Sequence, residues 1–224
     1  MAWQPLDTAQ ILIKHSLGEG KFPTRRRRGK WRARWEFDRA VEALGASDIV
    51  IDCGANVGQF TRAMAASGAT VYAFEPDPWT FGRLSESIGT RDNVRLINTA
   101  VSTLNGEAML YRARGFKSDP DGLSESSSLY TSKTNIDEKS GVRVGCIDLA
   151  AFILSLPDRV ALLKMDIEGA EVPVLLHLIA TGAINRVGHA FVEMHENRIP
   201  ELEVDARHLR ALVRGHPCIN LNWA

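Results

Sequence analysis

Short apolar runs rich in β-branched residues alternate with stretches of helical periodicity through most of the chain. Runs of this length and composition are typical of strands buried in a parallel sheet. The pattern predicts strands at residues 49–53, 70–74, 94–101, 160–166 and 190–194. It predicts helices at residues 59–67, 81–88, 148–155, 171–180 and 200–214. This alternation favours an α/β fold, with a mostly parallel sheet flanked by helices in a single domain.

The remaining segments are expected to form additional strands and a loop around that sheet. Residues 107–112 are predicted as an extra strand and residues 142–147 as a strand at a sheet edge. Residues 113–135 are polar and rich in Gly, Ser, Asp and Pro, which predicts a long surface loop. Long loops in compact domains are often functional. One short strand, near residues 218–223, is expected after the last helix.

Residues 1–48 precede the first predicted strand and are expected to form a helical, basic segment, with the main domain at 49–224. Between residues 25 and 34 a run of arginines and one lysine is interleaved with Trp31 and Trp35. Such a run is typical of a solvated helix face. The alternative is a cap or lid that grips an anionic acceptor, such as a phosphorylated or nucleotide-linked one. A single local patch is weak support for nucleic-acid binding.

The composition narrows the classes of function. The chain has 224 residues, 45% of them hydrophobic, which suffices for one domain with a full core. Its 27 basic and 27 acidic residues cancel, so no nucleic-acid partner is expected from the bulk charge. Cys53, Cys146 and Cys218 lack paired spacing, which argues against a disulfide framework or a zinc site. Neither a signal peptide nor a membrane-spanning run is seen, so a cytoplasmic location is expected.

The segment from Asp52 to Gly58 reads as the end of a strand, a tight glycine turn and the start of a helix. Gly54 lets the backbone approach a ligand closely, and Gly58 lets the helix pack near the strand. Glu75 follows Asp52 by 23 residues, at the end of the next predicted strand. A carboxylate there accepts hydrogen bonds from both hydroxyls of a ribose. Together these residues predict a nucleoside pocket at the carboxyl ends of adjacent parallel strands.

The residue at position 56 favours one class of nucleoside. A dinucleotide site uses the pattern GxGxxG, because the pyrophosphate lies on the helix N-terminus. Here Asn56 stands where the second glycine would be, which weakens the case for NAD. S-adenosylmethionine (SAM) has no phosphate, and its amino-acid part tolerates a polar side chain there. An NAD-dependent oxidoreductase and a non-catalytic SAM-binding module stay open as alternatives.

Five segments resemble FkbM-type SAM-dependent methyltransferases. They are VIDCGANVGQFT, VYAFEPDP, LINTAVS, LLKMDIEGAE and FVEMHE, in family order from about residue 49 to 196. The resemblance implies a Rossmann-like class I methyltransferase fold. It implies that SAM binds at Gly54, Asn56, Gly58 and Glu75. It places Asp52 nearby, together with the segment from Asn98 to Ser102, which would lie toward the adenine.

Two features depart from the family pattern. The usual C-terminal antiparallel hairpin is abbreviated, since only one strand is predicted after residue 215. The basic run near the N-terminus is not part of the family signature. Both departures concern the acceptor and the oligomeric state, which the sequence leaves open, rather than the cofactor.

Four ionisable residues follow the fourth and fifth predicted strands: Asp166, Glu168, Glu193 and His195. The carboxyl ends of parallel strands face the ligand crevice of an open α/β sheet, so these side chains are expected near the reacting groups. His195, Asp166 and Glu193 are the catalytic candidates, with His195 or Asp166 removing a hydroxyl proton. An alternative is a divalent ion held by all four residues, but they show no dedicated ligand spacing, so no metal is expected.

These expectations combine into a SAM-dependent O-methyltransferase. Methyl transfer is an in-line displacement, so the enzyme must mainly align the acceptor oxygen with the methyl group and exclude water. The family resemblance suggests a hydroxyl on a sugar, glycolipid or lipo-oligosaccharide, with a polyketide or other small metabolite as the alternative. The loop at 113–135 and the N-terminal segment are the candidates for acceptor recognition.

Overall fold

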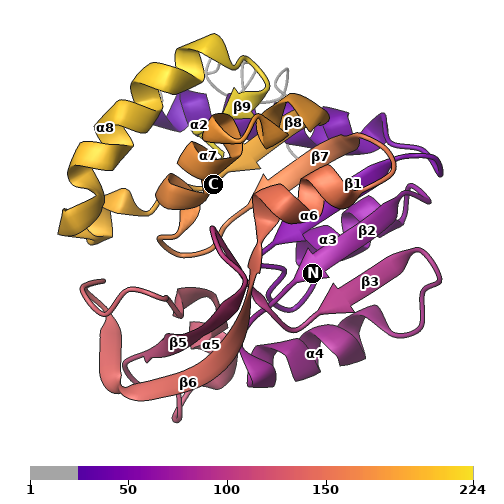
Figure 1. Cartoon of the computed structure of the whole chain (residues 1–224). Helices are drawn as coiled ribbons and strands as arrows, with labels where there is room; N and C mark the ends of the chain where they lie inside the picture. The colour runs from indigo at the N-terminus through magenta and orange to yellow at the C-terminus, as the bar shows by residue number, and fades with distance from the viewer. Residues whose placement is uncertain (1–24, 224) are drawn as a thin grey trace, which may run out of the picture.

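The computed structural model describes residues 25–223, so the first half of the predicted N-terminal segment lies outside the described part (Figure 1). Its centre is a six-stranded sheet in which all neighbouring strands are parallel. In spatial order the strands are β3 (Val94–Ile97), β2 (Thr70–Phe74), β1 (Ile49–Cys53), β7 (Val160–Met165), β8 (Val187–Val192) and β9 (Ile219–Asn220). The predicted mostly parallel α/β sheet is therefore confirmed.

Helices cover both faces of the sheet, which explains why its strands are nearly continuous apolar runs. Successive side chains of β1 point to opposite faces, so Val50 joins one core and Ile51 the other. The helices on the Val50 face are α2 (Arg25–Glu42), α3 (Gln59–Ala65) and α4 (Pro78–Ile88). Those on the Ile51 face are α6 (Leu149–Ser155), α7 (Glu171–Ala180) and α8 (Glu203–Leu212).

Helix α2 is anchored to the sheet by one aromatic side chain. Phe37 is 1% exposed, and its ring centroid lies 5.3 Å from those of Phe191 and Trp223. Trp31 and Trp35 of the same helix are 40% and 56% exposed. The helix that carries much of the basic run thus covers the sheet with its apolar side and turns two tryptophans to solvent.

A second sheet of three strands lies apart from the first (Figure 1). Its strands are β4 (Ala100–Ser102), β6 (Ile136–Asp148) and β5 (Gly106–Ala113), in that spatial order. β4 pairs with β6 in parallel, and β5 pairs with β6 in antiparallel. The strands predicted at 107–112 and 142–147 are confirmed, but they pair with each other instead of extending the main sheet.

The prediction of a single strand over residues 94–101 was wrong. The segment is divided between β3 in the main sheet and β4 in the second sheet. At the break, the side-chain amide of Asn98 donates to the backbone carbonyls of Glu75 and Pro76, at 2.8 and 3.0 Å. These bonds hold the chain against the residues that follow β2, so that it turns away from the main sheet.

The predicted polar loop contains the short helices α5 (Pro120–Leu123) and η1 (Ser124–Ser126). The other short 3-10 helices are η2 (Ala183–Arg186), η3 (Glu196–Arg198), η4 (Pro200–Leu202) and η5 (Val213–Gly215). Between residue 215 and the last described residue the chain forms one strand, β9, which pairs in parallel with β8.

Candidate active site

The turn after β1 is clamped between the two strands beside it. The backbone amides of Gly54 and Ala55 donate to the carbonyl of Phe74 at the end of β2, at 3.0 and 2.9 Å. Gly54 has φ 75°, and a Cβ on it would lie 1.8 Å from the backbone oxygen of Asp166, which follows β7. A side chain is therefore excluded on both conformational and steric grounds.

Asn56 and Gly58 complete the turn with two further left-handed residues, at φ 47° and 88°. Asparagine tolerates this conformation better than most residues. A Cβ on Gly58 would lie 2.9 Å from terminal carbons of Leu84 and Ile88, so this glycine lets the turn pack on α4. Gly58 thus has a packing role that differs from the ligand approach made possible by Gly54.

Glu75 closes β2 with a buried carboxylate, only 6% exposed. Its Oε2 accepts from the backbone amide of Asn56 at 2.9 Å, and its Oε1 accepts from that of Asp77 at 3.0 Å. Burial raises the pKa of Glu75 to about 7, although both amide bonds act in the opposite direction. The carboxylate is therefore held rigidly, and each oxygen keeps a lone pair for a further donor.

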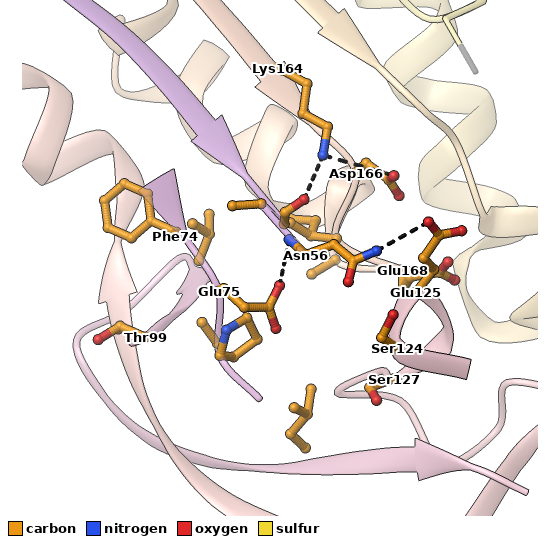
Figure 2. Close-up of a pocket in the computed structure, with 18 of the residues that line it drawn as sticks. Asn56, Phe74, Glu75, Thr99, Ser124, Glu125, Ser127, Lys164, Asp166 and Glu168 are labelled. Carbon is orange, nitrogen blue, oxygen red and sulfur yellow. Dashed lines mark hydrogen bonds and ion pairs between the residues drawn. The ribbon is translucent and has the colours of Figure 1, made fainter. Parts of the chain in front are cut away.

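A pocket opens at the carboxyl ends of β1, β2 and β7 (Figure 2). Gly54, Asn56 and Glu75 line it on one side, and Asp166 and Glu168 line it on the other. The second sheet and the loop supply the rest of the wall, at Thr99, Ala100, Val101, Leu110, Ser124, Glu125, Ser127 and Leu129.

Four of the residues predicted to bind the cofactor lie outside the pocket wall. These are Asp52, Gly58, Asn98 and Ser102, whereas Gly54, Asn56 and Glu75 are part of the wall. Asp52 is fully buried and accepts from the hydroxyl of Thr61 at 2.7 Å. Asn98 fixes the backbone after Glu75, and its neighbours Thr99–Val101 line the pocket instead.

Lys164 links the two sides of the pocket from beneath. It is 2% exposed, and its Nζ donates to the Gly54 carbonyl at 2.6 Å. The same nitrogen lies 3.4 Å from Asp52 Oδ1 and 3.9 Å from Asp166 Oδ2. Burial alone would lower the pKa of Lys164, but the charges of Asp52 and Asp166 outweigh it and raise the pKa. Lys164 therefore remains an ammonium group that fixes the glycine turn.

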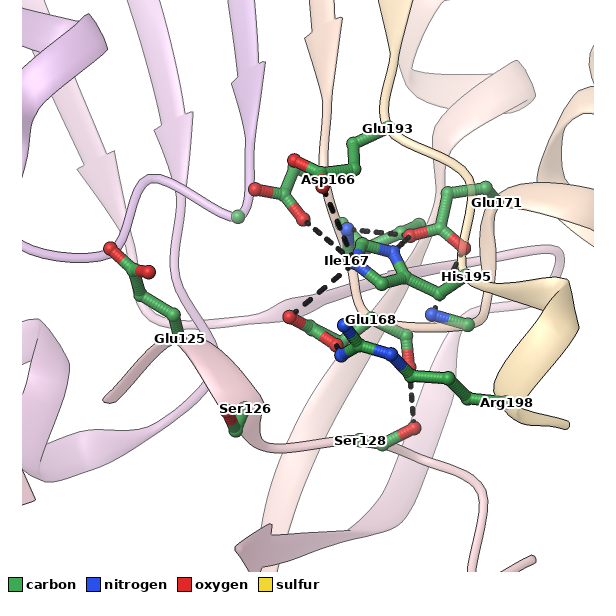
Figure 3. Close-up of polar contacts among 12 residues, drawn as sticks. Glu125, Ser126, Ser128, Asp166, Ile167, Glu168, Glu171, Glu193, His195 and Arg198 are labelled. Carbon is green, nitrogen blue, oxygen red and sulfur yellow. Dashed lines mark hydrogen bonds and ion pairs between the residues drawn. The ribbon is translucent and has the colours of Figure 1, made fainter. Parts of the chain in front are cut away.

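The predicted catalytic residues meet around the imidazole of His195 (Figure 3). His195 Nε2 lies 3.6 Å from Glu168 Oε1, 3.9 Å from Asp166 Oδ1 and 4.0 Å from Glu193 Oε1. His195 is 5% exposed. Burial raises the pKa values of Glu168 and Glu193. Asp166 and Glu168 belong to the pocket wall, while Glu193 and His195 stand behind them.

Glu171, the first residue of α7, holds the other side of that imidazole. Its Oε1 lies 2.9 Å from His195 Nδ1, and because a carboxylate only accepts, the ring nitrogen is the donor. Burial alone would lower the pKa of His195, but the bond to Glu171 and the charges of Glu171, Glu168 and Asp166 raise it to about 9. In this state the imidazole is mostly protonated at neutral pH.

The polar loop, residues 113–135, contacts the same group of charged residues. Lys133, whose side chain is fully buried, pairs with Glu168 Oε2 at 2.5 Å and donates to the carbonyl of Ser126 at 2.8 Å. The hydroxyl of Ser128 donates to the backbone oxygen of Glu168 at 2.6 Å. On the other side of the pocket, the side-chain amide of Asn56 donates to Glu125 at 3.1 Å. The loop therefore spans the pocket between its two sides.

Residues 52–216, which include every one of these groups, match the model of the methyltransferase FkbM domain. The chain belongs to the FkbM methyltransferase family. The predicted family is thereby confirmed. Within the described residues, no helix has the length and apolar character needed to cross a membrane.

Several curated relatives of this FkbM methyltransferase are also methyltransferases by name. Over 136 residues it is 29% identical to the 2-O-methyltransferase NoeI of Sinorhizobium fredii, covering 57% of this chain and 56% of that protein. It is 27% identical over 145 residues to Methyltransferase 1 of Beauveria bassiana, covering 57% of each. The match thus spans little more than half the length of these relatives.

Two other likenesses are more limited. A 59-residue stretch is 41% identical to the ribosomal RNA small subunit methyltransferase A of Moorella thermoacetica, covering 26% of this chain and 20% of that protein. A solved rRNA methylase from Streptococcus thermophilus superposes with a TM-score of 0.42 at 14% identity, over 76% of each chain.

Three buried residues of this methyltransferase site did not emerge from the sequence as site residues. Lys164 interrupts an apolar strand directly opposite Asp52 in the pairing of β1 with β7, and a buried opposite-charge pair of this kind was a usable signal. Glu171 lies in the first turn of α7, where the helix dipole alone accounts for a carboxylate, but it also orients His195. Lys133 lies in the polar loop, where nothing in the sequence pattern marks it as buried.

Proposed function

We propose that this methyltransferase transfers the methyl group of SAM to a hydroxyl of a sugar, glycolipid or lipo-oligosaccharide. The observation that carries the SAM assignment is the carboxylate of Glu75. It lies on the pocket wall at the end of β2, and backbone amides fix both of its oxygens. Such a carboxylate is suited to accept hydrogen bonds from the two ribose hydroxyls of an adenosine group.

A second observation supports SAM over a dinucleotide. The side-chain oxygen of Asn56 is buried and, among the described residues, has no hydrogen-bond partner. A buried acceptor without a donor is costly, and the ammonium group of an amino-acid moiety supplies such a donor. A pyrophosphate, which carries only acceptor oxygens, does not satisfy it. Gly54, Asn56 and Glu75 would therefore hold the amino-acid and ribose parts of SAM, with Thr99–Val101 toward the base.

The opposite wall is suited to the acceptor. SAM supplies an electrophilic methyl carbon, and attack by the acceptor oxygen breaks the carbon–sulfur bond while the hydroxyl proton passes to a base. Asp166 and Glu168 line the pocket, and Glu193 and His195 stand directly behind them. The three carboxylates offer hydrogen-bond acceptors for hydroxyls and a place for the proton. The loop residues Ser124–Leu129 close the same side.

The class of acceptor follows from chemistry and from one relative. A wall of carboxylates and serine hydroxyls is suited to a ligand with several hydroxyl groups, such as a sugar. NoeI, the relative from Sinorhizobium fredii, is named a 2-O-methyltransferase. Among residues 29–42 of the basic helix α2, which include the exposed Trp31 and Trp35, none lines the pocket wall.

The test has two stages. Calorimetric titration of the chain with SAM and, separately, with NAD measures the cofactor, and we expect saturable binding of SAM alone. Incubation with SAM carrying a labelled methyl group and a panel of glycans then measures transfer, and we expect label on a hydroxyl oxygen of one glycan class. Binding of NAD in place of SAM would overturn the cofactor assignment. SAM binding without transfer to any hydroxyl would support a binding module.

A further inference from the structure

The group formed by Asp166, Glu168 and His195 has a second feature besides its place beside the pocket. In each of the two carboxylates, one oxygen faces a buried lysine and the other faces His195. Glu168 presents Oε2 to Lys133 at 2.5 Å and Oε1 to His195 at 3.6 Å. Asp166 presents Oδ2 to Lys164 at 3.9 Å and Oδ1 to His195 at 3.9 Å. One oxygen of each acid is thus oriented by a buried lysine, and the other faces the same small space.

The imidazole of His195 completes that space with its Nε2 nitrogen. His195 is 5% exposed, and its Nδ1 is engaged by Glu171 at 2.9 Å. Nε2 faces carboxylate oxygens of Glu168, Asp166 and Glu193 at 3.6, 3.9 and 4.0 Å, which are ion-pair distances longer than a hydrogen bond. A histidine nitrogen that faces several carboxylate oxygens at these distances, with none of them in a hydrogen bond to it, leaves a space suited to a cation.

Glu171 makes this nitrogen a potential metal ligand. Glu171 accepts a hydrogen bond from Nδ1, so an arriving cation would displace only the Nε2 proton of the imidazolium, and the freed lone pair would face the two carboxylates. A carboxylate that holds the far nitrogen of a histidine in this way is the usual support of metal-binding histidines. Glu171 is itself fixed, since it accepts from the backbone amides of Ile167 and Gly169 at 3.0 and 2.9 Å. The ring orientation is therefore set before any ion arrives.

We propose that Asp166, Glu168 and His195 bind one divalent cation of the Mn²⁺ type. One ligand atom from each residue lies within 4.8 Å of the other two. Two ligands at about 2.2 Å from a common ion are about 3 to 4.4 Å apart, which matches the separations across His195 Nε2. Two carboxylates and one imidazole favour Mn²⁺, because Mg²⁺ and Ca²⁺ prefer oxygen ligands alone and Zn²⁺ prefers more nitrogen or sulfur.

The use of the ion, though not its binding, rests on the proposed function. Asp166 and Glu168 belong to the pocket wall, so an ion on them is accessible to a hydroxyl of the acceptor. The ion would orient that oxygen and favour loss of its proton. The oxygen–methyl bond forms as the carbon–sulfur bond of SAM breaks, and the proton passes to Glu193. Glu193 is left for this task because Asp166 and His195 are engaged as ligands.

The first experiment measures the metal alone. The full chain, treated with a chelator and then freed of it, is titrated with MnCl₂ in a calorimeter without SAM. We expect one ion per chain, and about tenfold or greater loss of affinity in Asp166→Asn and in Glu168→Gln. The matched control is Glu203→Gln, an exposed acid on α8, which should bind as the wild type does. The proposal would be overturned if Mn²⁺ shows no saturable binding. It would also be overturned if the Asp166→Asn and Glu168→Gln variants bind Mn²⁺ as tightly as the wild type does.

A second measurement on the wild type does not depend on the variants folding. Electron spin-echo modulation of bound Mn²⁺ should show coupling to one imidazole nitrogen, and its absence would contradict ligation by His195. Failure of the cation site and failure of the proposed function are distinguishable. Mn²⁺ binding without SAM binding would contradict the proposed function and support the cation site. Glycan methylation that is insensitive to chelator, with no Mn²⁺ binding, would do the reverse.

Discussion

The two sides of the pocket are built in different ways. The side after β1 and β2 is a glycine turn and one carboxylate, held almost entirely by backbone hydrogen bonds. The side after β7 and β8 is a group of charged side chains, which depends on Glu171 and on the buried lysines Lys133 and Lys164. The first side is defined by backbone shape, and the second by electrostatic contacts between distant segments.

This difference has a functional counterpart. A ligand common to a whole family is best recognised by a rigid surface that leaves little room for variation. An acceptor that differs between members is better recognised by side chains, which change singly without moving the backbone. The comparison therefore predicts that damage to the first side abolishes binding of the methyl donor, whereas damage to the second lowers turnover and leaves donor binding intact.

The largest loss of stability is expected at Lys164, the residue that contacts both sides of the pocket. Lys164→Met leaves Asp52 as a buried charge without its partner, and it removes the donor to the Gly54 carbonyl. Removing one member of a buried ion pair typically costs about 3–5 kcal/mol. We expect a loss of that size in the free energy of unfolding, measured with urea. Adding Asp52→Asn should restore part of it, and the exposed Arg143→Met should change stability little.

Gly54→Ala should have the next largest effect on stability. The new Cβ would lie 1.8 Å from the backbone oxygen of Asp166, at a φ of 75° that alanine resists, so the turn must open. We expect about 3 kcal/mol of destabilisation and loss of measurable SAM binding. Gly82→Ala on α4 is the matched control, because its Cβ meets open space. There the same change should be neutral or stabilising in thermal melting. Equal melting temperatures for both variants would refute the steric argument.

Glu75→Gln tests the donor side alone. Hydrogen bonds to a charged group contribute about 1.5–3 kcal/mol, so SAM affinity should fall by roughly 10- to 100-fold. The wild type should also depend on pH. Burial raises the pKa of Glu75 to about 7, and ribose hydroxyls need the ionised acceptor, so affinity should rise with pH up to about 7 and then level off. Calorimetry across this range should show a flat profile for the glutamine variant.

Glu171→Gln should have the smallest effect, confined to the acceptor side. Glutamine keeps the size of the side chain but holds the His195 ring less firmly. Loss of such a supporting carboxylate typically lowers activity by about tenfold or more. We expect that reduction in kcat, with the Kd for SAM unchanged. A matching loss of SAM affinity would show that the two sides are not separable in the way the structure indicates.

The sequence predicts the two sides of the pocket to different extents. The order of strands and helices, the turn at Gly54 and the carboxylate of Glu75 depend on local patterns that are legible in a few consecutive residues. The burial of Lys133 depends on a contact with Glu168, 35 residues later in the chain, and no local pattern encodes it. Sheet assignment failed at Asn98 for a similar reason, because the turn there depends on carbonyl groups that follow β2.

The anchoring of the polar loop has a consequence for how such enzymes diversify. Ser128 and Lys133 both hold Glu168, and Glu125 holds Asn56, whereas residues 117–123 contribute nothing to the pocket wall. The outer turn is thus a module that evolution or a designer can lengthen, shorten or replace. The residues that follow the turn stay fixed to the site while the turn itself is exchanged, so new acceptors are within reach without rebuilding the catalytic centre.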